Sequence, residues 1–350
     1  MTCLQPGRVG VVYWRKETDL LSLISGTARD LGCEVTNFSA DSRVPQGLDV
    51  VLACGPFGSL APLGSQLSRM PPGERPALAL WMTEQFSNPA LPAWAQRLAG
   101  AARSRLERLA YHETDAGVWQ LNPRLQPFTR RAHRLRYFGD LMWLREAGAL
   151  TVLAVGSRWI AQYLKARGID AMVAFIGAHP SWGADLNLER DVPVLWLGKV
   201  ASSRRRRVLQ AVRADLRRRG LDMLMVDGEE HPYVFGDERT RLLNRTRVAL
   251  NILREPWDNH SLRYFLAAPN RAMVVTEPTY PHTPFEPGVH LVSAPVDQLA
   301  DTIAHYVTHE TERSRIAERA YELVTSELTM RRSVSDILTQ ALSRRPIPDT

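Results

Sequence analysis

The stretch Val248–Glu277, VALNILREPWDNHSLRYFLAAPNRAMVVTE, contains the pattern that decides the fold. Its first apolar run, Val248–Leu253, is typical of a buried strand. A polar loop over Glu255–Ser261 follows, a helix-length apolar stretch begins at Leu262, and a second β-rich run covers Ala272–Thr276. Strand, loop, helix and strand form one unit of a parallel sheet, which binds ligands at the carboxyl ends of its strands. The loop therefore lies where a ligand is expected, just before a helix N-terminus whose free N–H groups suit a phosphate.

Strand and helix signals alternate along most of the chain, which predicts an α/β protein with parallel, doubly wound sheets. The expected strands are Arg8–Tyr13, Glu34–Phe38, Asp49–Ala53, Ala77–Met82, Leu150–Val155, Ala171–Phe175, Val192–Leu197 and Asp222–Val226. The expected helices are Asp19–Leu31, Leu91–Arg108, Ser157–Arg167, Val208–Arg219, Thr240–Asn244, Val296–Thr308 and a long tail from Glu310 to about Leu342. Residues 118–140 carry Arg and Pro and give no clear assignment.

The segment Val248–Glu277 resembles the donor-binding half of GT-B glycosyltransferases of the group-1, family-4-like superfamily, and in particular its CgeB-like branch. The residues that carry the resemblance are Asn259, Ser261, Arg263, Tyr264, Phe265, Ala267, Ala268, Thr276 and Glu277. Two positions depart from that family: Leu266 stands where a glutamate usually holds the ribose, and Arg271 stands where glycine is usual. The departure at Leu266 leaves the donor, or the activity itself, open.

The resemblance implies two Rossmann-like domains whose parallel sheets face a central cleft. Residues 1–180 are expected to bind the acceptor, and residues 181–330 to bind the nucleotide sugar. The loop-like segment Gly177–Asn187 is expected to link the two domains, and residues 331–350 to form a helix and tail that return to the first domain.

Composition limits the class of protein further. The 350 residues carry a net charge of +7, mostly as arginine, which favours an anionic partner such as a nucleotide sugar, a nucleic acid or a phospholipid surface. No apolar run has the roughly 20 residues that cross a bilayer, and the N-terminus lacks a signal-peptide layout, so a cytoplasmic protein is expected. The three cysteines have no metal spacing and are expected to be reduced.

The turn after the strand Val192–Leu197 is a candidate phosphate site. Gly198, Lys199 and Arg204 follow that strand, and Lys199 and Arg204 keep the spacing of the two basic residues that the family places here, with the two types exchanged. Four consecutive arginines, Arg204–Arg207, oppose the dipole at a helix N-terminus, and a bound anion would relieve that cost. The alternative is a solvated basic helix face, which we favour for Arg205 and Arg206.

The loop before Leu262 supplies the second group of candidates. Asn259 and Ser261 can cap the helix and present N–H groups to a donor phosphate. By resemblance, Asp258 occupies the place of a carboxylate near the sugar; the alternative is an Asx-turn. Arg263 either pairs with a phosphate or braces the sheet. Glu277, at the end of the last strand, either accepts from a ribose or sugar hydroxyl or is solvated at the surface.

Candidates in the first half are less specific. Glu84 and His112 can serve as the base on the acceptor hydroxyl, although a lone histidine is more often a surface group. The sequence lacks a Gly-x-Gly-x-x-Gly motif, which argues against a dinucleotide dehydrogenase. Its histidines are scattered and it lacks an Asp-x-Asp motif, so no metal is expected.

The resemblance therefore implies a metal-independent, hexosyltransferase-like glycosyltransferase with no cofactor other than its nucleotide-diphosphate sugar. Its acceptor is open, a small molecule or a glycan being favoured. Two alternatives remain: a degenerate GT-B scaffold that binds a nucleotide or a partner without catalysis, and a transferase acting on nucleic acid or a membrane-associated acceptor.

Overall fold

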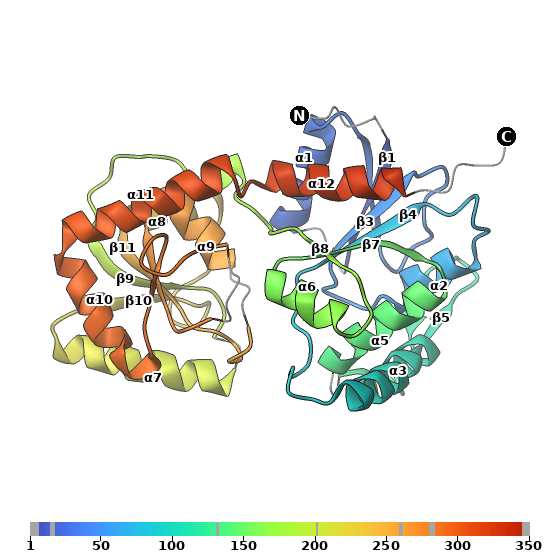
Figure 1. The fold of residues 1–350 in the computed structure, drawn as a ribbon, viewed down its shortest axis with the longest axis horizontal. Helices are drawn as coiled ribbons and strands as arrows, with labels where there is room; N and C mark the ends of the chain where they lie inside the picture. The colour runs from blue at the N-terminus through green and yellow to red at the C-terminus, as the bar shows by residue number, and fades with distance from the viewer. Residues whose placement is uncertain are drawn as a thin grey trace. The chain divides into compact units, whose positions relative to one another are not determined.

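The computed structural model describes residues 7–14, 18–130, 133–200, 202–258, 262–279 and 284–344. The chain divides into two compact units. The first contains Met1–Phe175 together with Ser333–Thr350, and the second contains Ile176–Arg332 (Figure 1). Each unit has its own parallel sheet, and the chain passes between the units twice.

The first unit is built on a six-stranded parallel sheet with the order β2-β1-β3-β4-β7-β8. Its strands are β1 (Arg8–Tyr13), β2 (Glu34–Ser39), β3 (Val50–Gly55), β4 (Ala77–Met82), β7 (Leu150–Val155) and β8 (Met172–Val173). β3 and β4 are buried along their whole length, as expected for central strands covered on both faces. A separate antiparallel hairpin joins β5 (Tyr111–Glu113) to β6 (Trp119–Leu121).

Helices cover both faces of this sheet. The helices of this unit are α1 (Asp19–Asp30), α2 (Ala61–Arg69), α3 (Ala93–Ala110), α4 (Gln126–Arg130), α5 (His133–Glu146), α6 (Arg158–Lys165) and most of α12 (Met330–Ser343), of which α3 packs against α5. Side chains of α2, α5 and α6 join β3, β4 and β7 in one apolar core. In α12, the side chains of Val334, Ile337, Leu338 and Ala341 are fully buried.

The second unit has a five-stranded parallel sheet with the order β10-β9-β11-β12-β13. Its strands are β9 (Val192–Leu197), β10 (Met223–Val226), β11 (Thr246–Asn251), β12 (Met273–Thr276) and β13 (Val292–Ser293). Its helices are α7 (Ser203–Arg218), α8 (Gly236–Arg245), α9 (Leu262–Ala267), α10 (Leu299–Thr308) and α11 (Glu310–Ser326). α7, α10 and α11 share one apolar core with the sheet.

α3 packs with its polar face inward. Its buried residues include Gln96, Arg103, Ser104 and Glu107, whereas Trp94, Leu98 and Leu109 are exposed. Glu107 accepts hydrogen bonds from Arg103 Nη1 at 2.7 Å and from Arg136 Nη1 of α5 at 2.9 Å. Paired charges tolerate burial, so this network fixes which way the helix faces.

The two helices also approach closely where Gly100 of α3 faces Gly139 of α5. A Cβ atom on Gly139 would overlap the carbonyl oxygen of Gly100. The contact therefore requires glycine, and it locks α3 against α5 with its polar face turned inward.

Two parallel-sheet domains are confirmed, and so are most of the predicted elements. The strand predicted at Ala171–Phe175 shrinks to Met172–Val173. The long helix predicted from Glu310 to Leu342 is wrong, because it breaks into α11 and α12. At the break, Ala178 N donates to Leu328 O at 2.8 Å and Met330 N donates to Ala178 O at 2.9 Å. A distant segment thus takes over the backbone hydrogen bonds that a continuous helix needs.

Residues 118–140 gain a structure that the sequence did not assign. They hold the end of the hairpin, α4 and the start of α5. Within the described part of the chain, no helix is long and apolar enough to span a membrane.

Candidate functional site

The carboxyl ends of β9, β11 and β12 meet at one edge of the second unit's sheet, since all three strands run parallel. The strands end at Leu197, Asn251 and Thr276. The turns that follow and the first turns of α7 and α9 carry five residues that the sequence singles out as donor-binding: Gly198, Lys199, Arg204, Arg263 and Glu277. Ligands of such sheets bind at this edge.

Arg263, in the first turn of α9, braces two of these strand ends. Its Nε donates to Leu197 O at 2.6 Å, and its Nη1 donates to Asn251 Oδ1 at 3.1 Å. The guanidinium also lies 3.9 Å from the centre of the buried Trp196 ring. Burial, and secondly the neighbouring charge of Arg205, lower the pKa of Arg263 to about 9. Of the two alternatives for Arg263, a phosphate partner or a brace of the sheet, these contacts are those of a brace.

Glu277 is buried, with 4% of its side chain exposed, and is held by Arg204. Its Oε1 accepts from Leu253 N at 2.6 Å and from Arg204 Nη1 at 3.1 Å, and its Oε2 accepts from Arg204 Nη2. The same Nη1 lies 3.1 Å from Leu253 O. The hydrogen bond to Glu277 raises the pKa of Arg204. Surface solvation, one alternative for Glu277, is therefore wrong.

Arg205 corrects a second expectation. We favoured a solvated helix face for it, but only 6% of the residue is exposed. Its Nη1 donates to Lys199 O at 3.1 Å, and its guanidinium lies 5.4 Å from the Trp196 ring centre. Burial, and then the charge of Arg254, lower its pKa to about 10. Arg206 is exposed and pairs with Glu229 at 3.3 Å, as a solvated face requires.

Several N–H donors at this edge are buried without an acceptor. Arg205 Nε, Arg254 Nε and Trp257 Nε1 have no hydrogen-bond partner within the described residues. Buried donors normally have partners, and a ligand with several acceptor oxygens would supply them here. Sequence analysis places the loop that contains Trp257 at the ligand edge, but it names neither Arg254 nor Trp257 as a binding residue; the signal for Arg254 is its place directly after a strand.

Asp258 is buried beside the arginines, with 5% of the residue exposed. Its charge raises the pKa of both Arg263 and Arg205, against the larger effect of burial. Its backbone N donates to Glu255 O at 3.0 Å, which closes a turn. Asn259 and Ser261, the other candidates in this loop, lie outside the described residues.

The turn after β9 places Gly198, Lys199 and the start of α7 at the same edge. Gly198 has φ 118°, and a Cβ atom there would lie 3.0 Å from Arg263 Nη2. Lys199 is exposed, and its carbonyl holds Arg205. Ser202 caps α7, because its Oγ accepts from Arg205 N at 3.2 Å and donates to Arg254 O at 3.1 Å. One serine therefore ties the helix N-terminus to the end of β11.

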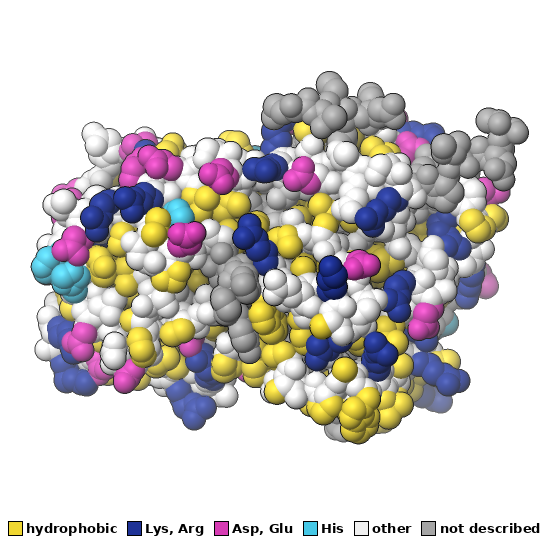
Figure 2. All heavy atoms as spheres, in the orientation of Figure 1, with side chains coloured by type: hydrophobic (Ala, Val, Ile, Leu, Met, Phe, Trp, Pro, Cys, Tyr) yellow, Lys and Arg dark blue, Asp and Glu magenta, His cyan; other side chains and the backbone are white. Residues whose placement is uncertain are grey.

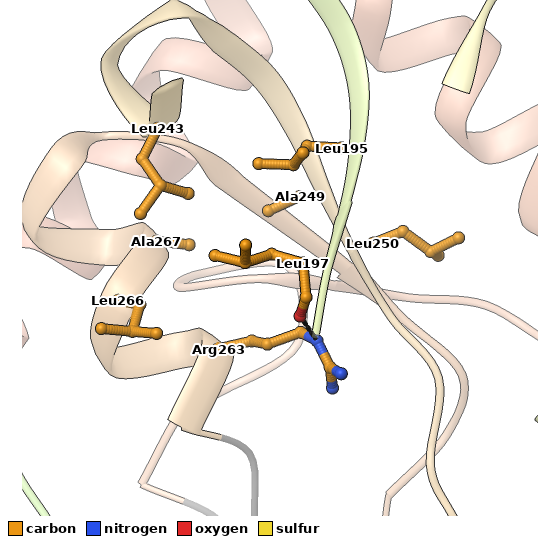
Figure 3. A pocket seen from close by; sticks show the side chains of 8 residues that line it. All are labelled: Leu195, Leu197, Leu243, Ala249, Leu250, Arg263, Leu266 and Ala267. Atoms are coloured by element: carbon orange, nitrogen blue, oxygen red, sulfur yellow. Dashed lines mark hydrogen bonds between the residues drawn. The ribbon is translucent and has the colours of Figure 1, made fainter. Parts of the chain in front are cut away.

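Leu266 lines an apolar cavity of about 10 Å³, which Arg263 also lines and which has room for about one water molecule. Figure 3 shows Leu266 and Ala267 of α9 beside Leu243 of α8, facing Leu197 of β9. Only 7% of Leu266 is exposed. The residue that departs from the family's glutamate therefore belongs to the core.

The two candidates of the first unit lie on different sheets. Glu84 follows β4 and its N donates to Gly55 O at 3.4 Å; its charge adds to burial in raising the pKa values of Cys54 and Tyr137 to about 12. His112 is exposed on β5 of the separate hairpin. The described residues contain no cluster of three or more His, Cys, Asp or Glu side chains able to hold a metal.

Comparison with known proteins agrees with this architecture. Residues 197–339 match the family model described as glycosyl transferase-like. A search of curated protein sequences gives no match.

Solved structures share the fold over nearly the whole chain. Sucrose-phosphate synthase from Thermosynechococcus elongatus is 11% identical, with a TM-score of 0.59 over 94% of this chain and 97% of that one. Anabaena HepE, solved with UDP and glucose, is 10% identical, with a TM-score of 0.59 over 96% and 99%. The glycosyltransferase AviGT4 of avilamycin A biosynthesis is 13% identical, with a TM-score of 0.56 over 97% and 98%.

The chain therefore has the GT-B fold, and residues 197–339 are similar to the glycosyl transferase-like family. Its assignment to the CgeB-like branch stays a prediction.

Proposed function

We propose that this protein is a glycosyltransferase that takes a sugar from a nucleotide-diphosphate sugar and transfers it to an acceptor hydroxyl, without a metal. The observation that carries the proposal is the set of buried donors at the carboxyl edge of the second sheet. Arg205 Nε, Arg254 Nε and Trp257 Nε1 all lack acceptors there, within the described residues. A diphosphate offers the acceptor oxygens and the negative charge that such a group requires.

Electrostatics support the same ligand. Burial lowers the pKa values of Arg205 and Arg263 to about 10 and about 9, so the site holds cations whose charge water does not stabilise. Asp258 and Glu277 offset part of that charge, and Glu277 is itself occupied by Arg204. A diphosphate would supply the remaining negative charge.

The chemistry follows from charge development. As the bond between sugar and phosphate breaks, negative charge grows on the leaving diphosphate. Lys199, Arg205 and the N-terminus of α7 would stabilise that charge, a role that a metal plays in other enzymes. Arg204, Arg263 and Gly198 would hold the turns in place. Transfer of a hexose is the expected reaction, and Anabaena HepE, a structural neighbour, binds UDP and glucose.

The test is calorimetric titration of the chain with UDP, GDP, dTDP, ADP and CMP. We expect selective binding of one diphosphate, weakened at least tenfold by Lys199→Ala and by Arg205→Gln. Arg206→Ala on the same helix, whose side chain is exposed and paired with Glu229, is the matched control and should bind as the parent does. Binding of no nucleotide by the folded parent would refute the donor site.

A second function has one observation in its favour, the apolar cavity around Leu266. A degenerate scaffold would bind a nucleotide without turnover, since it lacks the family's glutamate. Incubation with the selected nucleotide sugar and a panel of small-molecule and glycan acceptors separates the two functions. One glycosylated product eliminates the degenerate scaffold, and tight binding without transfer or hydrolysis supports it.

A further inference from the structure

The exposed side of α3 is apolar and basic, although the helix lies on the surface of the first unit. This side, the α3 outer face, consists of Trp94, Arg97, Leu98, Ala101, Ala102, Arg105 and Leu109. Trp94, Leu98 and Leu109 are 71%, 69% and 68% exposed, the largest values among the big apolar side chains of the described residues. Figure 2 shows hydrophobic side chains gathered over the lower end of this unit, where Figure 1 places α3.

The orientation of α3 is specified by its contacts. Its inward face carries the buried ion pairs of Glu107, the hydrogen bond from Ser104 Oγ to Asp140 Oδ1 at 2.6 Å, and the glycine contact with α5. A helix that turned its leucines inward would break all three. These contacts therefore hold the apolar residues of α3 on its outward side. An exposed apolar surface that is held in place in this way indicates a binding surface.

The charges on the outer face restrict the partner. Arg97 and Arg105 are exposed, and the one acidic residue of α3, Glu107, is buried. Large apolar side chains flanked by arginine, with no exposed acid, match the interfacial region of an anionic bilayer. There, tryptophan and leucine enter the acyl boundary and arginine reaches the phosphates.

A second copy of the chain fits this face less well. In a two-fold dimer the same face meets itself, which brings the arginines of the two copies together without acidic partners on α3. Like charges held at a desolvated contact oppose association.

We propose that the α3 outer face binds the surface of an anionic phospholipid bilayer. The helix lies in the plane of the interface, with Trp94, Leu98 and Leu109 inserted below the headgroups and Arg97 and Arg105 on lipid phosphates. This surface is independent of the nucleotide site, so either proposal can fail alone.

The test is sedimentation of the full chain with vesicles of phosphatidylglycerol and phosphatidylcholine, or of phosphatidylcholine alone. We expect binding to the anionic vesicles, weakened at least tenfold by Leu98→Ser with Leu109→Ser. The matched control is Leu186→Ser with Leu188→Ser, two leucines of the second unit that are 38% and 41% exposed, and it should bind as the parent does. Arg97→Ser with Arg105→Ser should remove the preference for anionic lipid.

Quenching by brominated acyl chains reports the depth of insertion. The tryptophan fluorescence of the parent should fall when it binds the brominated vesicles. Trp94→Phe should abolish that fall, although the variant should still sediment with the vesicles. Absence of binding at low salt, or parent-like binding by the double leucine variant, overturns the proposal. The proposal is also overturned if light scattering shows that the parent is a dimer and that the double leucine variant is a monomer. In that case a second copy of the chain covers the α3 outer face.

Discussion

Arg204 and Glu277 are 73 positions apart in the sequence, yet the guanidinium of Arg204 binds the Glu277 carboxylate through both of its terminal nitrogens. The pair joins the first turn of α7 to the end of β12, and the same carboxylate accepts from Leu253 N after β11. One buried carboxylate thus ties together the turns after three strands.

We predict that Glu277→Ala destabilises the fold by about 1–3 kcal/mol, because it leaves a buried N–H of Leu253 without an acceptor. The exposure of Arg204, 27% of its side chain, keeps the cost below that of a fully buried pair, since water can reach the freed guanidinium. Urea unfolding of both proteins measures the difference. Glu229→Ala, which breaks the exposed ion pair with Arg206 of α7, should cost less than about 0.5 kcal/mol; equal costs would contradict the assignment.

Asp140 predicts a pH-dependent stability. Burial raises the pKa of this carboxyl to about 6, against a hydrogen bond from Ser104 that lowers it. The folded state thus binds the proton more tightly than the unfolded state, whose pKa is about 3.9. Stability therefore falls as pH rises from about 4 to about 6 and is then constant for this group.

Asp140→Asn removes the free-energy cost of ionising a buried carboxyl group. It should stabilise the protein by about 2–3 kcal/mol at pH 8, with little effect near pH 4. Urea unfolding at both pH values tests it. Asp115→Asn, at an exposed position of the same unit, is the control. A gain that is equal at the two pH values would show that the pKa shift is not its source.

Arg271 is one of two non-glycine residues with positive φ in the described chain, at 51°. Its side chain offsets the strain: Nε donates to Glu318 Oε2 at 2.6 Å, and the guanidinium lies 3.7 Å from the Tyr321 ring centre. Arg271→Ala loses these contacts and keeps the strain, so we expect a loss of about 1–2 kcal/mol.

Arg271→Gly loses the same contacts but relieves the backbone, so its net change should stay within about 1 kcal/mol. Thermal unfolding of the two variants makes the comparison, and a glycine variant no more stable than the alanine variant would refute the strain.

Gly139→Ala should cost more than about 3 kcal/mol or prevent folding, because the added methyl group overlaps the Gly100 carbonyl. Gly26→Ala, in the interior of α1 with no atom within 4 Å of the new Cβ, should stabilise by about 0.5–1 kcal/mol. Circular dichroism during thermal unfolding measures both. A mild effect at Gly139 would mean that α3 can shift away from α5.

Local patterns predicted the sheet units well, because apolar runs and capping residues act over a few positions. The unit from Val248 to Thr276 is an example, with β11, α9 and β12 near their expected places. The break between α11 and α12 escaped prediction because its cause, the backbone of Ala178, lies far away in the sequence.

The candidate site was predicted by position more than by side chain. Arg204 and Glu277 were singled out separately, but nothing local shows that they pair. For Arg205 the sequence favours a solvated helix face, and only the tertiary position of Trp196 and Lys199 O reveals its burial. A helix was expected at Leu91–Arg108, yet its sequence cannot show that the polar side is the buried one.

The division of the chain has a consequence for its biosynthesis. The first unit takes its last helix from residues after Arg332, and Val334, Ile337, Leu338 and Ala341 are fully buried in it. The second unit is contiguous and has all its residues once the ribosome has passed Arg332. The unit synthesised first is thus completed last, which reverses the usual order of folding during translation. Until α12 leaves the ribosome, the first unit exposes the apolar surface that this helix covers, so this surface is available to chaperones while the second unit is synthesised.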